Sequence, residues 1–137
     1  MRMRLEHVGI VVKDVDAARA YYADLYGCVP LTPVVDEPAH EVRVQLLDAG
    51  HGSMPSIELV EPVGETSRVA AFLKKTGGGL HHLAYAVADL DAALTHLKSK
   101  GAMPLGAPVP GAAHKVRTAW LFTPGRELIE LIELPDA

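Results

Sequence analysis

Residues 80–93 read LHHLAYAVADLDAA, and residues 5–18 read LEHVGIVVKDVDAA. The two stretches are offset by 75 positions (80 − 5), and seven of their fourteen residues are identical. Two more pairs follow in the same order: GCVPL at 27–31 with GAMPL at 101–105, and IELVE at 57–61 with IELIE at 129–133. Their offsets are 74 (101 − 27) and 72 (129 − 57). Segments repeated in one order indicate that the chain contains the same structural unit twice.

The composition is that of a folded protein of one domain's length. The chain has 137 residues, 49% of them hydrophobic, which is enough to build a buried core. A net charge of -4 without a Lys/Arg cluster argues against a nucleic-acid partner, and no apolar run reaches the ~20 residues of a membrane span. Cys28 is the only cysteine, which excludes an internal disulfide. No secretory signal is recognisable at the N-terminus, so we expect a cytoplasmic location.

Each copy is predicted to begin with a strand followed by a helix. Alternating β-branched residues at 5–12 predict the strand, after which Asp14 is a good N-cap and Gly27 a good helix stop. Asp89 and Gly101 hold the equivalent positions in the second copy. The first helix is expected to run through Ala17, Ala20, Tyr21 and Leu25, and the second to present the apolar stripe Leu90, Ala93, Leu94 and Leu97.

Three further strands are expected after each helix. They cover about 28–35, 41–48 and 55–61 in the first copy, and about 103–109, 115–122 and 127–133 in the second. A short helix over 67–75 lies between the copies. We therefore predict an α+β fold in which two tandem βαβββ modules form a half-open, cup-shaped mixed sheet with helices outside. The single domain of 1–137 is expected to consist of module one (1–62), a linker helix (63–79) and module two (80–137).

Strand alternation predicts one imidazole and one carboxylate on the inner face of each module. The apolar residues that flank His7 and Glu58 on their strands are expected to lie under a helix, so these two side chains face the open side. His82 and Glu130 hold the equivalent positions in module two. Two buried carboxylates would repel one another unless a cation or a proton lay between them. The set therefore predicts a site for a divalent metal, with Co, Mn, Ni, Zn and Fe left open.

Other polar side chains are candidates for contact with a substrate. By alternation Arg43 and Gln45 are expected to face the cup, and the aliphatic residues between them, including Val44, to pack under the helices. Arg117 is expected at the rim of the cup, where an arginine can bind a carboxylate or a phosphate.

Several aromatic and histidine residues have a structural interpretation. Trp120 is expected in the core rather than against a substrate, and His81 beside the linker helix. His51 and His114 have no partner in the repeat and are expected at the surface. The loop at 48–55 is longer than a tight hairpin needs, so it could rim the pocket.

Taken together, the motifs resemble the vicinal oxygen chelate superfamily, which includes glyoxalase I, extradiol dioxygenases and antibiotic-resistance proteins. Within it the chain is most similar to the methylmalonyl-CoA epimerases. The similar segments are LEHVGIVVKDVDAARAYY at 5–22, IELVEP at 57–62, VAAFLKKTGGGLHHLAYAVADLDAAL at 69–94 and LIEL at 128–131. The resemblance implies an isomerase that acts on methylmalonyl-CoA or a similar acyl compound through a metal-stabilised enolate. It also implies a homodimer, and its metal ligands map onto His7, Glu58, His82 and Glu130.

Two positions depart from the family pattern. At position 58 some epimerases carry Gln, where this chain has Glu58. In several epimerases the proposed base is a Glu on the third strand of module one, where this chain has Val44. Glu41, at the mouth of that strand, and Glu130, if it leaves the metal, are the remaining candidates for proton transfer. Two alternatives stay open. A glyoxalase-I-like lyase or isomerase also fits the His/Glu/His/Glu set, and a drug-binding protein without catalysis would need no base.

Overall fold

The computed structural model describes residues 1–50, 55–110 and 115–137. The chain divides into two compact units, which we call the first unit (His7–His81) and the second unit (Met1–Glu6 with His82–Ala137). Each contains most of one copy of the sequence repeat, but residues 5–6 of the first copy belong to the second unit and residues 80–81 of the second copy belong to the first unit. Among the described residues, no helix is both long and apolar enough to span a bilayer.

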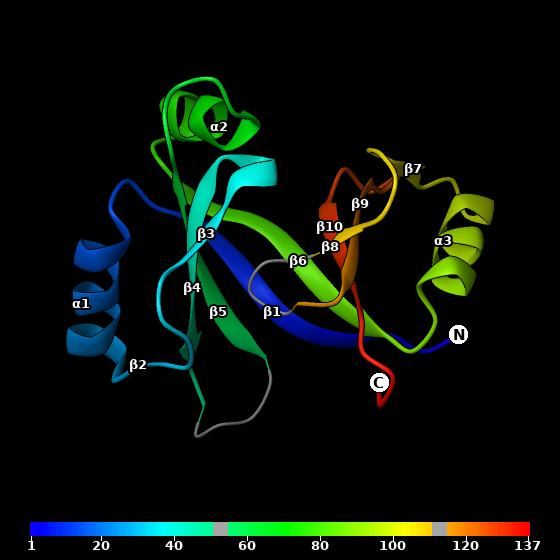
Figure 1. Cartoon of the computed structure of the whole chain (residues 1–137), viewed down its shortest axis with the longest axis horizontal. Coiled ribbons are helices and arrows are strands. Elements are labelled where there is room, and N and C mark those ends of the chain that lie inside the picture. The colour runs from blue at the N-terminus through cyan, green and yellow to red at the C-terminus, as the bar shows by residue number, and fades with distance from the viewer. Residues whose placement is uncertain (51–54, 111–114) are drawn as a thin grey trace. The chain divides into compact units, whose positions relative to one another are not determined.

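The first unit is a small mixed sheet with a helix on one face. Its elements are β1 (Arg4–Val11, of which His7 onward belongs here), α1 (Val15–Tyr26), β2 (Val29–Pro30), β3 (Val35–Glu37), a 3-10 turn η1 (Pro38–His40), β4 (Val42–Asp48), β5 (Ser56–Pro62) and α2 (Arg68–Thr76). Strand β5 is parallel to β1 and antiparallel to β4, and the short strands β2 and β3 pair with β4. Helix α1 packs against β4 and β5 (Figure 1).

The second unit repeats this plan. Its elements are β6 (Gly79–Val87, of which His82 onward belongs here), α3 (Leu90–Ser99), β7 (Met103–Pro104), β8 (Val109–Pro110), β9 (Arg117–Phe122) and β10 (Leu128–Glu133). Strand β10 is parallel to β6 and antiparallel to β9, while β7 and β8 pair with β9. The predicted α+β class with an open mixed sheet is confirmed, and the short helix expected over 67–75 is present as α2 (Arg68–Thr76).

The second predicted strand of each module is not continuous. Where one strand was expected at 28–35 and another at 103–109, the structure has the pairs β2/β3 and β7/β8. Pro33 and Pro108 lie in the two interruptions. Proline has no backbone N–H to donate to a ladder, so it confines pairing to the short pieces on either side.

The helix ends follow the sequence signals. The Asp14 carboxylate accepts hydrogen bonds from the backbone N–H groups of Asp16 and Ala17, and Asp89 accepts one from Ala92. Helix α1 ends at Gly27, whose φ of 70° is in the left-handed region that glycine adopts most easily. Helix α3 ends at Ser99 and its C-cap is Lys100, one residue before Gly101, whose φ is 96°.

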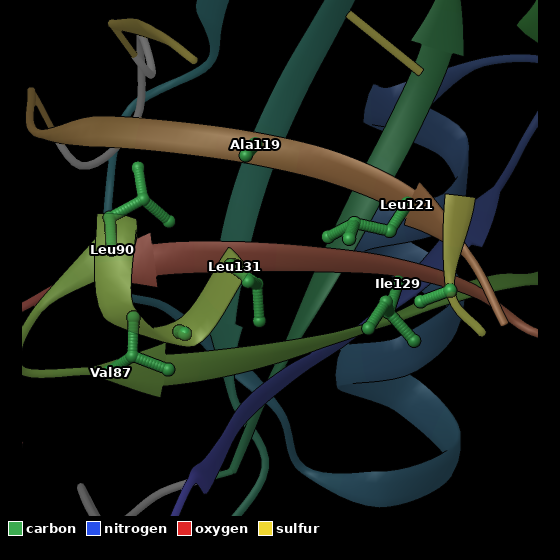
Figure 2. Close-up of a cluster of buried hydrophobic side chains, with 8 residues drawn as sticks. Val87, Leu90, Ala119, Leu121, Ile129 and Leu131 are labelled. Atoms are coloured by element: carbon green, nitrogen blue, oxygen red, sulfur yellow. The ribbon is translucent and has the colours of Figure 1, made fainter. Parts of the chain in front are cut away.

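Each unit has its own hydrophobic core on the helix side of its sheet. In the second unit, side chains from β6, α3, β9 and β10 converge on one cluster (Figure 2), which includes Val87, Leu90, Ala119, Leu121, Ile129 and Leu131. The first unit buries Val15, Cys28, Leu47 and Leu59, with Ala18 and Tyr22 of α1 packed against them. Tyr21 and Leu25, two residues through which the sequence traces α1, are instead exposed.

Candidate metal centre

A buried imidazole and a buried carboxylate face each other in the first unit. The Nε2 atom of His7 lies 3.6 Å from an Oε1 atom of Glu58, and both side chains are almost fully buried. The register explains the approach, because Glu58 of β5 lies beside Gly9 of β1, and His7 is two residues before Gly9 on the same face. A small residue beside the carboxylate leaves the diagonal open for the imidazole. Ile57 and Leu59, the neighbours of Glu58, pack on the opposite, α1-facing side, as predicted.

The second unit repeats the pair. The Nε2 atom of His82 lies 3.8 Å from an Oε1 atom of Glu130, and both residues are buried. Ala84 holds the place of Gly9, beside the carboxylate of the neighbouring strand. Ile129 and Leu131 lie on the other face, in the core cluster under α3. The repeat in sequence is therefore also a repeat in side-chain geometry.

Two further carboxylates, Glu61 and Glu133, lie three residues after Glu58 and Glu130, which we call the inner carboxylates. A spacing of three along a strand reverses the face, so they point toward the helices. The Glu61 carboxylate accepts a hydrogen bond of 2.8 Å from the backbone N–H of Val15, the first residue of α1, and pairs with Arg43 at 3.2 Å. We call this arrangement the outer clip, because it ties the start of the helix to the strand that holds Glu58.

The outer clip is also duplicated. Glu133 accepts from the N–H of Leu90, the first residue of α3, at 2.9 Å, and from two nitrogens of Arg117 at 3.0 and 3.1 Å. The Arg117 guanidinium and the Leu90 amide hold the pKa of the Glu133 carboxyl below its ordinary range, and Glu133 raises the pKa of Arg117. Asp91 adds a second carboxylate to Arg117 at 3.3 Å.

These contacts correct the expected positions of three predicted substrate ligands. Gln45 is opposite Leu59 in the sheet and buried on the α1 side, where it accepts from Arg19 and donates to the Thr32 carbonyl oxygen. Arg43 and Arg117 belong to the outer clips, also on the helix-facing side. The expectation that Arg43 and Gln45 face the same side as Glu58 is therefore wrong. It assumed that the polar residues of β4 turn away from the helix, but α1 and β5 supply partners for both.

The inner face of β4 is aliphatic. Leu46 is directly opposite Glu58, and Val44 is opposite Val60, so these side chains share the face of the inner pair. Val42 lies on the same face, and Val42, Val44 and Leu46 are all buried. The prediction that these residues pack under the helices is wrong for the same reason. Val44 thus lies on the side where a base would be useful, but its side chain cannot transfer a proton.

Glu41 lies just before β4, where strand alternation does not apply. Its φ of 54° is in the left-handed region, and the residue is exposed. Its carboxylate accepts a hydrogen bond of 2.9 Å from the Thr66 hydroxyl. This geometry gives Glu41 a role in joining the entrance of β4 to the segment before α2.

Trp120 is a site residue that the sequence interpretation assigned to the core. It is directly opposite Glu130 in the β9–β10 ladder, and its ring lies edge-to-face with His82 at a centroid distance of 4.7 Å. Strand alternation in β9 could have identified Trp120 as a site residue, because pairing with Glu130 places it on the same face of the sheet. His81 points the other way and contacts the Phe72 ring of α2, as expected. His51, His114 and the central part of the loop at 48–55 lie outside the described residues.

The comparisons with known proteins extend these observations. The sequence profile described as the glyoxalase/bleomycin resistance protein/dioxygenase superfamily matches residues 6–133. The chain belongs to this superfamily. The match begins just before His7 and ends at Glu133, so it includes both inner pairs and both outer clips.

Several methylmalonyl-CoA epimerases are similar in sequence to this chain. The ethylmalonyl-CoA/methylmalonyl-CoA epimerase of Cereibacter sphaeroides is 43% identical over 110 residues, which are 78% of each chain. The human mitochondrial methylmalonyl-CoA epimerase is 37% identical over 112 residues, covering 81% of this chain and 61% of the human protein. The crystal structure of the Mycobacterium tuberculosis epimerase matches with a TM-score of 0.85 at 36% identity, covering 95% of this chain and 87% of the other. The predicted kinship with these isomerases is confirmed.

The spacing of the histidine nitrogen and glutamate oxygen atoms in each pair suits a metal ion. Two ligand atoms that are about 2.0–2.2 Å from one metal and about 90–110° apart are separated by roughly 3.0–3.5 Å. The distances of 3.6 and 3.8 Å within the two His–Glu pairs are close to that range. Each pair thus needs only a small side-chain adjustment to bind an ion as two adjacent ligands.

Proposed function

We propose that this chain is a metal-dependent isomerase that epimerises methylmalonyl-CoA or a closely similar acyl-CoA. The observation that supports this most directly is the repeated, buried His–Glu pair, found in a chain that is 43% identical to an epimerase of ethylmalonyl-CoA and methylmalonyl-CoA. Burial of four such side chains is costly unless each has a strong partner, and a divalent ion is a partner for all four.

We propose that His7, Glu58, His82 and Glu130 bind one divalent ion. Each offers one nitrogen or oxygen donor, and the resulting 2-His, 2-carboxylate set suits first-row divalent metals. Among Co, Mn, Ni, Zn and Fe, the donor types alone favour no single ion. The aliphatic side chains beside Glu58 keep water away from this face and strengthen the attraction between the carboxylate and a cation.

When bound, the metal supplies positive charge that stabilises the enolate left after the α-proton departs. Glu130 is the proposed proton carrier once its carboxylate has left the metal, because it is a buried carboxylate on the inner face with His82 beside it. Glu41 is not carried forward in this role, since it is exposed and bonded to Thr66. Arg43, Gln45 and Arg117 are likewise left out, because other side chains of the fold bind them.

The reaction can be followed by proton NMR in deuterated water. Purified protein with Co²⁺ or Mn²⁺ is expected to replace the α-proton of methylmalonyl-CoA by deuterium, which collapses the methyl doublet. Glu130→Gln should lose this activity, whereas Glu133→Gln, on the same strand but the opposite face, should keep it. Absence of exchange by the wild-type protein with every one of the five metals would reject this substrate. Turnover of a glutathione hemithioacetal in a parallel assay would instead favour the glyoxalase-I-like alternative.

Metal binding itself can be tested with adjacent histidines. His82→Ala is expected to abolish stoichiometric metal binding in elemental analysis, while His81→Ala, which removes a ring packed on Phe72, should leave it intact. Equal metal content in the two variants would contradict the proposed ligand set.

We also propose that the chain forms a homodimer in the cytoplasm. Tyr21, Leu25 and Tyr26 of α1 expose large apolar surfaces, which monomeric proteins rarely gather on one helix. A second copy of the chain is the proposed partner for this helix. Sedimentation equilibrium should give twice the chain mass for the wild type and the monomer mass for Tyr26→Lys. The reduced, buried Cys28 agrees with a cytoplasmic location, which fractionation would check.

A further inference from the structure

The two inner His–Glu pairs, His7–Glu58 and His82–Glu130, differ in the residue that lies across the antiparallel ladder from the carboxylate. The residue directly across the ladder from Glu58 is Leu46, and the residue directly across from Glu130 is Trp120. The repeat therefore places a leucine and a tryptophan at equivalent positions. The indole ring reaches His82, with ring centroids 4.7 Å apart and planes at 78°.

This contact restricts the His82 imidazole. Edge-to-face aromatic pairs have a preferred geometry that an aliphatic neighbour does not impose. Rotation of the His82 ring about its Cβ–Cγ bond would break the contact, and the atoms that bury His82 also hinder this rotation. An imidazole must hold its ring plane to direct one nitrogen at a metal. Hydrogen-bonding groups that fix the ring from outside the ligand shell commonly change metal affinity by roughly 10–100-fold, and we expect an aromatic contact to act at the low end of that range.

We propose that Trp120 is a positioning residue that fixes the His82 imidazole for metal binding. The residue at the equivalent position of the first unit, Leu46, has no aromatic ring with which to make such a contact. This inference rests on the proposed metal site, but the contact between the two rings can be tested without a metal.

The internal repeat supplies the test variant. Trp120→Leu puts the first unit's residue into the second unit, and Trp120→Phe keeps an aromatic ring. Phe122→Leu is the matched control, since Phe122 is an exposed aromatic residue two positions further along the same strand. Circular dichroism and thermal melting should establish that each variant is folded.

The first measurement uses metal-free protein with ¹³C-labelled histidine. The imidazole C–H resonances of His82, assigned with His82→Ala, should carry a ring-current shift that Trp120→Leu removes and Trp120→Phe largely retains. Phe122→Leu should leave the shift in place. Unchanged His82 resonances in folded Trp120→Leu would overturn the proposal.

The second measurement is titration with Co²⁺, followed by calorimetry and by the visible absorption of the bound ion. Trp120→Leu is expected to weaken Co²⁺ binding by about tenfold and to alter the absorption spectrum, whereas Trp120→Phe should restore both. Equal affinity and spectrum in the wild type and Trp120→Leu, or failure of Trp120→Phe to restore them, would refute the positioning role. A wild-type protein that binds no Co²⁺ would overturn the proposed metal site instead, and the metal-free measurement would still decide whether Trp120 fixes His82.

Discussion

Gly78 lies in a run of three glycines where the backbone approaches another strand closely. A Cβ atom added at this position would lie 2.7 Å from the carbonyl oxygen of Val11, closer than van der Waals contact allows. The neighbouring atom belongs to the backbone, so it cannot rotate away. The φ of +102° is also one that L-residues rarely adopt.

Gly79 is a matched control, because it has a similar φ of +110° but no atom within 4 Å of the added Cβ. Alanine at either position would cost about 1–2 kcal/mol for the positive φ. At Gly78 the clash with Val11 adds about 1–3 kcal/mol, the usual range for overpacking. We therefore expect Gly78→Ala to lose about 2–5 kcal/mol of unfolding free energy, and Gly79→Ala only the first part.

Urea denaturation of the two variants measures the difference. With a slope of about 2 kcal/mol per molar urea, a gap of about 2 kcal/mol lowers the midpoint of Gly78→Ala by roughly 1 M relative to Gly79→Ala. Both variants change one hydrogen to a methyl group at a positive φ, so the comparison isolates the approach to Val11. Equal midpoints would refute the reasoning, because the close contact would then have no energetic consequence.

Three further results are expected. Glu133→Gln should destabilise the protein most near neutral pH. Because the pKa of Glu133 is lowered in the native state, its ionised carboxylate stabilises the fold above the ordinary carboxyl range, and this contribution is lost as the pH falls through the native pKa. The urea midpoints of the variant and the wild type should therefore converge at low pH. Val44→Glu should speed α-proton exchange by about a hundredfold over Val44→Gln in the deuterium assay, since a positioned base contributes about 10²–10⁴; equal rates would show that this face does not meet the substrate. Removal of metal with a chelator should lower the melting temperature of the wild-type protein. The loss of stability is about 2.7 kcal/mol if the free metal concentration had been 100 times the Kd for metal binding. The melting temperature of His82→Ala should not change when the chelator is added.

The sequence predicted the elements and the inner pairs well because the repeat supplied two independent observations of each. His7 with Glu58 and His82 with Glu130 recur at equivalent positions, and alternation along β5 and β10 places the carboxylates opposite the helix-facing aliphatics. When a strand has one polar residue between two aliphatic residues, the alternation indicates which face of the sheet the polar side chain is on. Pro33 and Pro108 were visible in the sequence, but the prediction of one continuous strand in each module did not allow for the ladder hydrogen bonds that proline cannot make.

Strand β4 could not be oriented from its own pattern. Both of its faces are buried, so the usual rule that the aliphatic face meets the helix has no force there. Gln45 meets the helix side because Arg19 and the Thr32 carbonyl satisfy its amide, and these partners come from distant parts of the chain. The exposed side of α1 was missed for a related reason, since Tyr22 rather than Tyr21 lies against the core, a choice made by packing and not by composition.

The spacing of Glu58 and Glu61, repeated in Glu130 and Glu133, limits where the chain can change length. Deleting one residue between the two carboxylates would move the second to the inner face and leave the helix end without its partner. The offset between the copies drops from 75 to 72 along the module (82 − 7 and 130 − 58), yet IELVE and IELIE have the same number of residues. Length differences between the copies lie elsewhere: α1 has 12 residues and α3 has 10, and β4 has 7 residues where β9 has 6. An engineer can lengthen the loops or exchange side chains on these strands, but must keep the residue count from the inner carboxylate to the outer one.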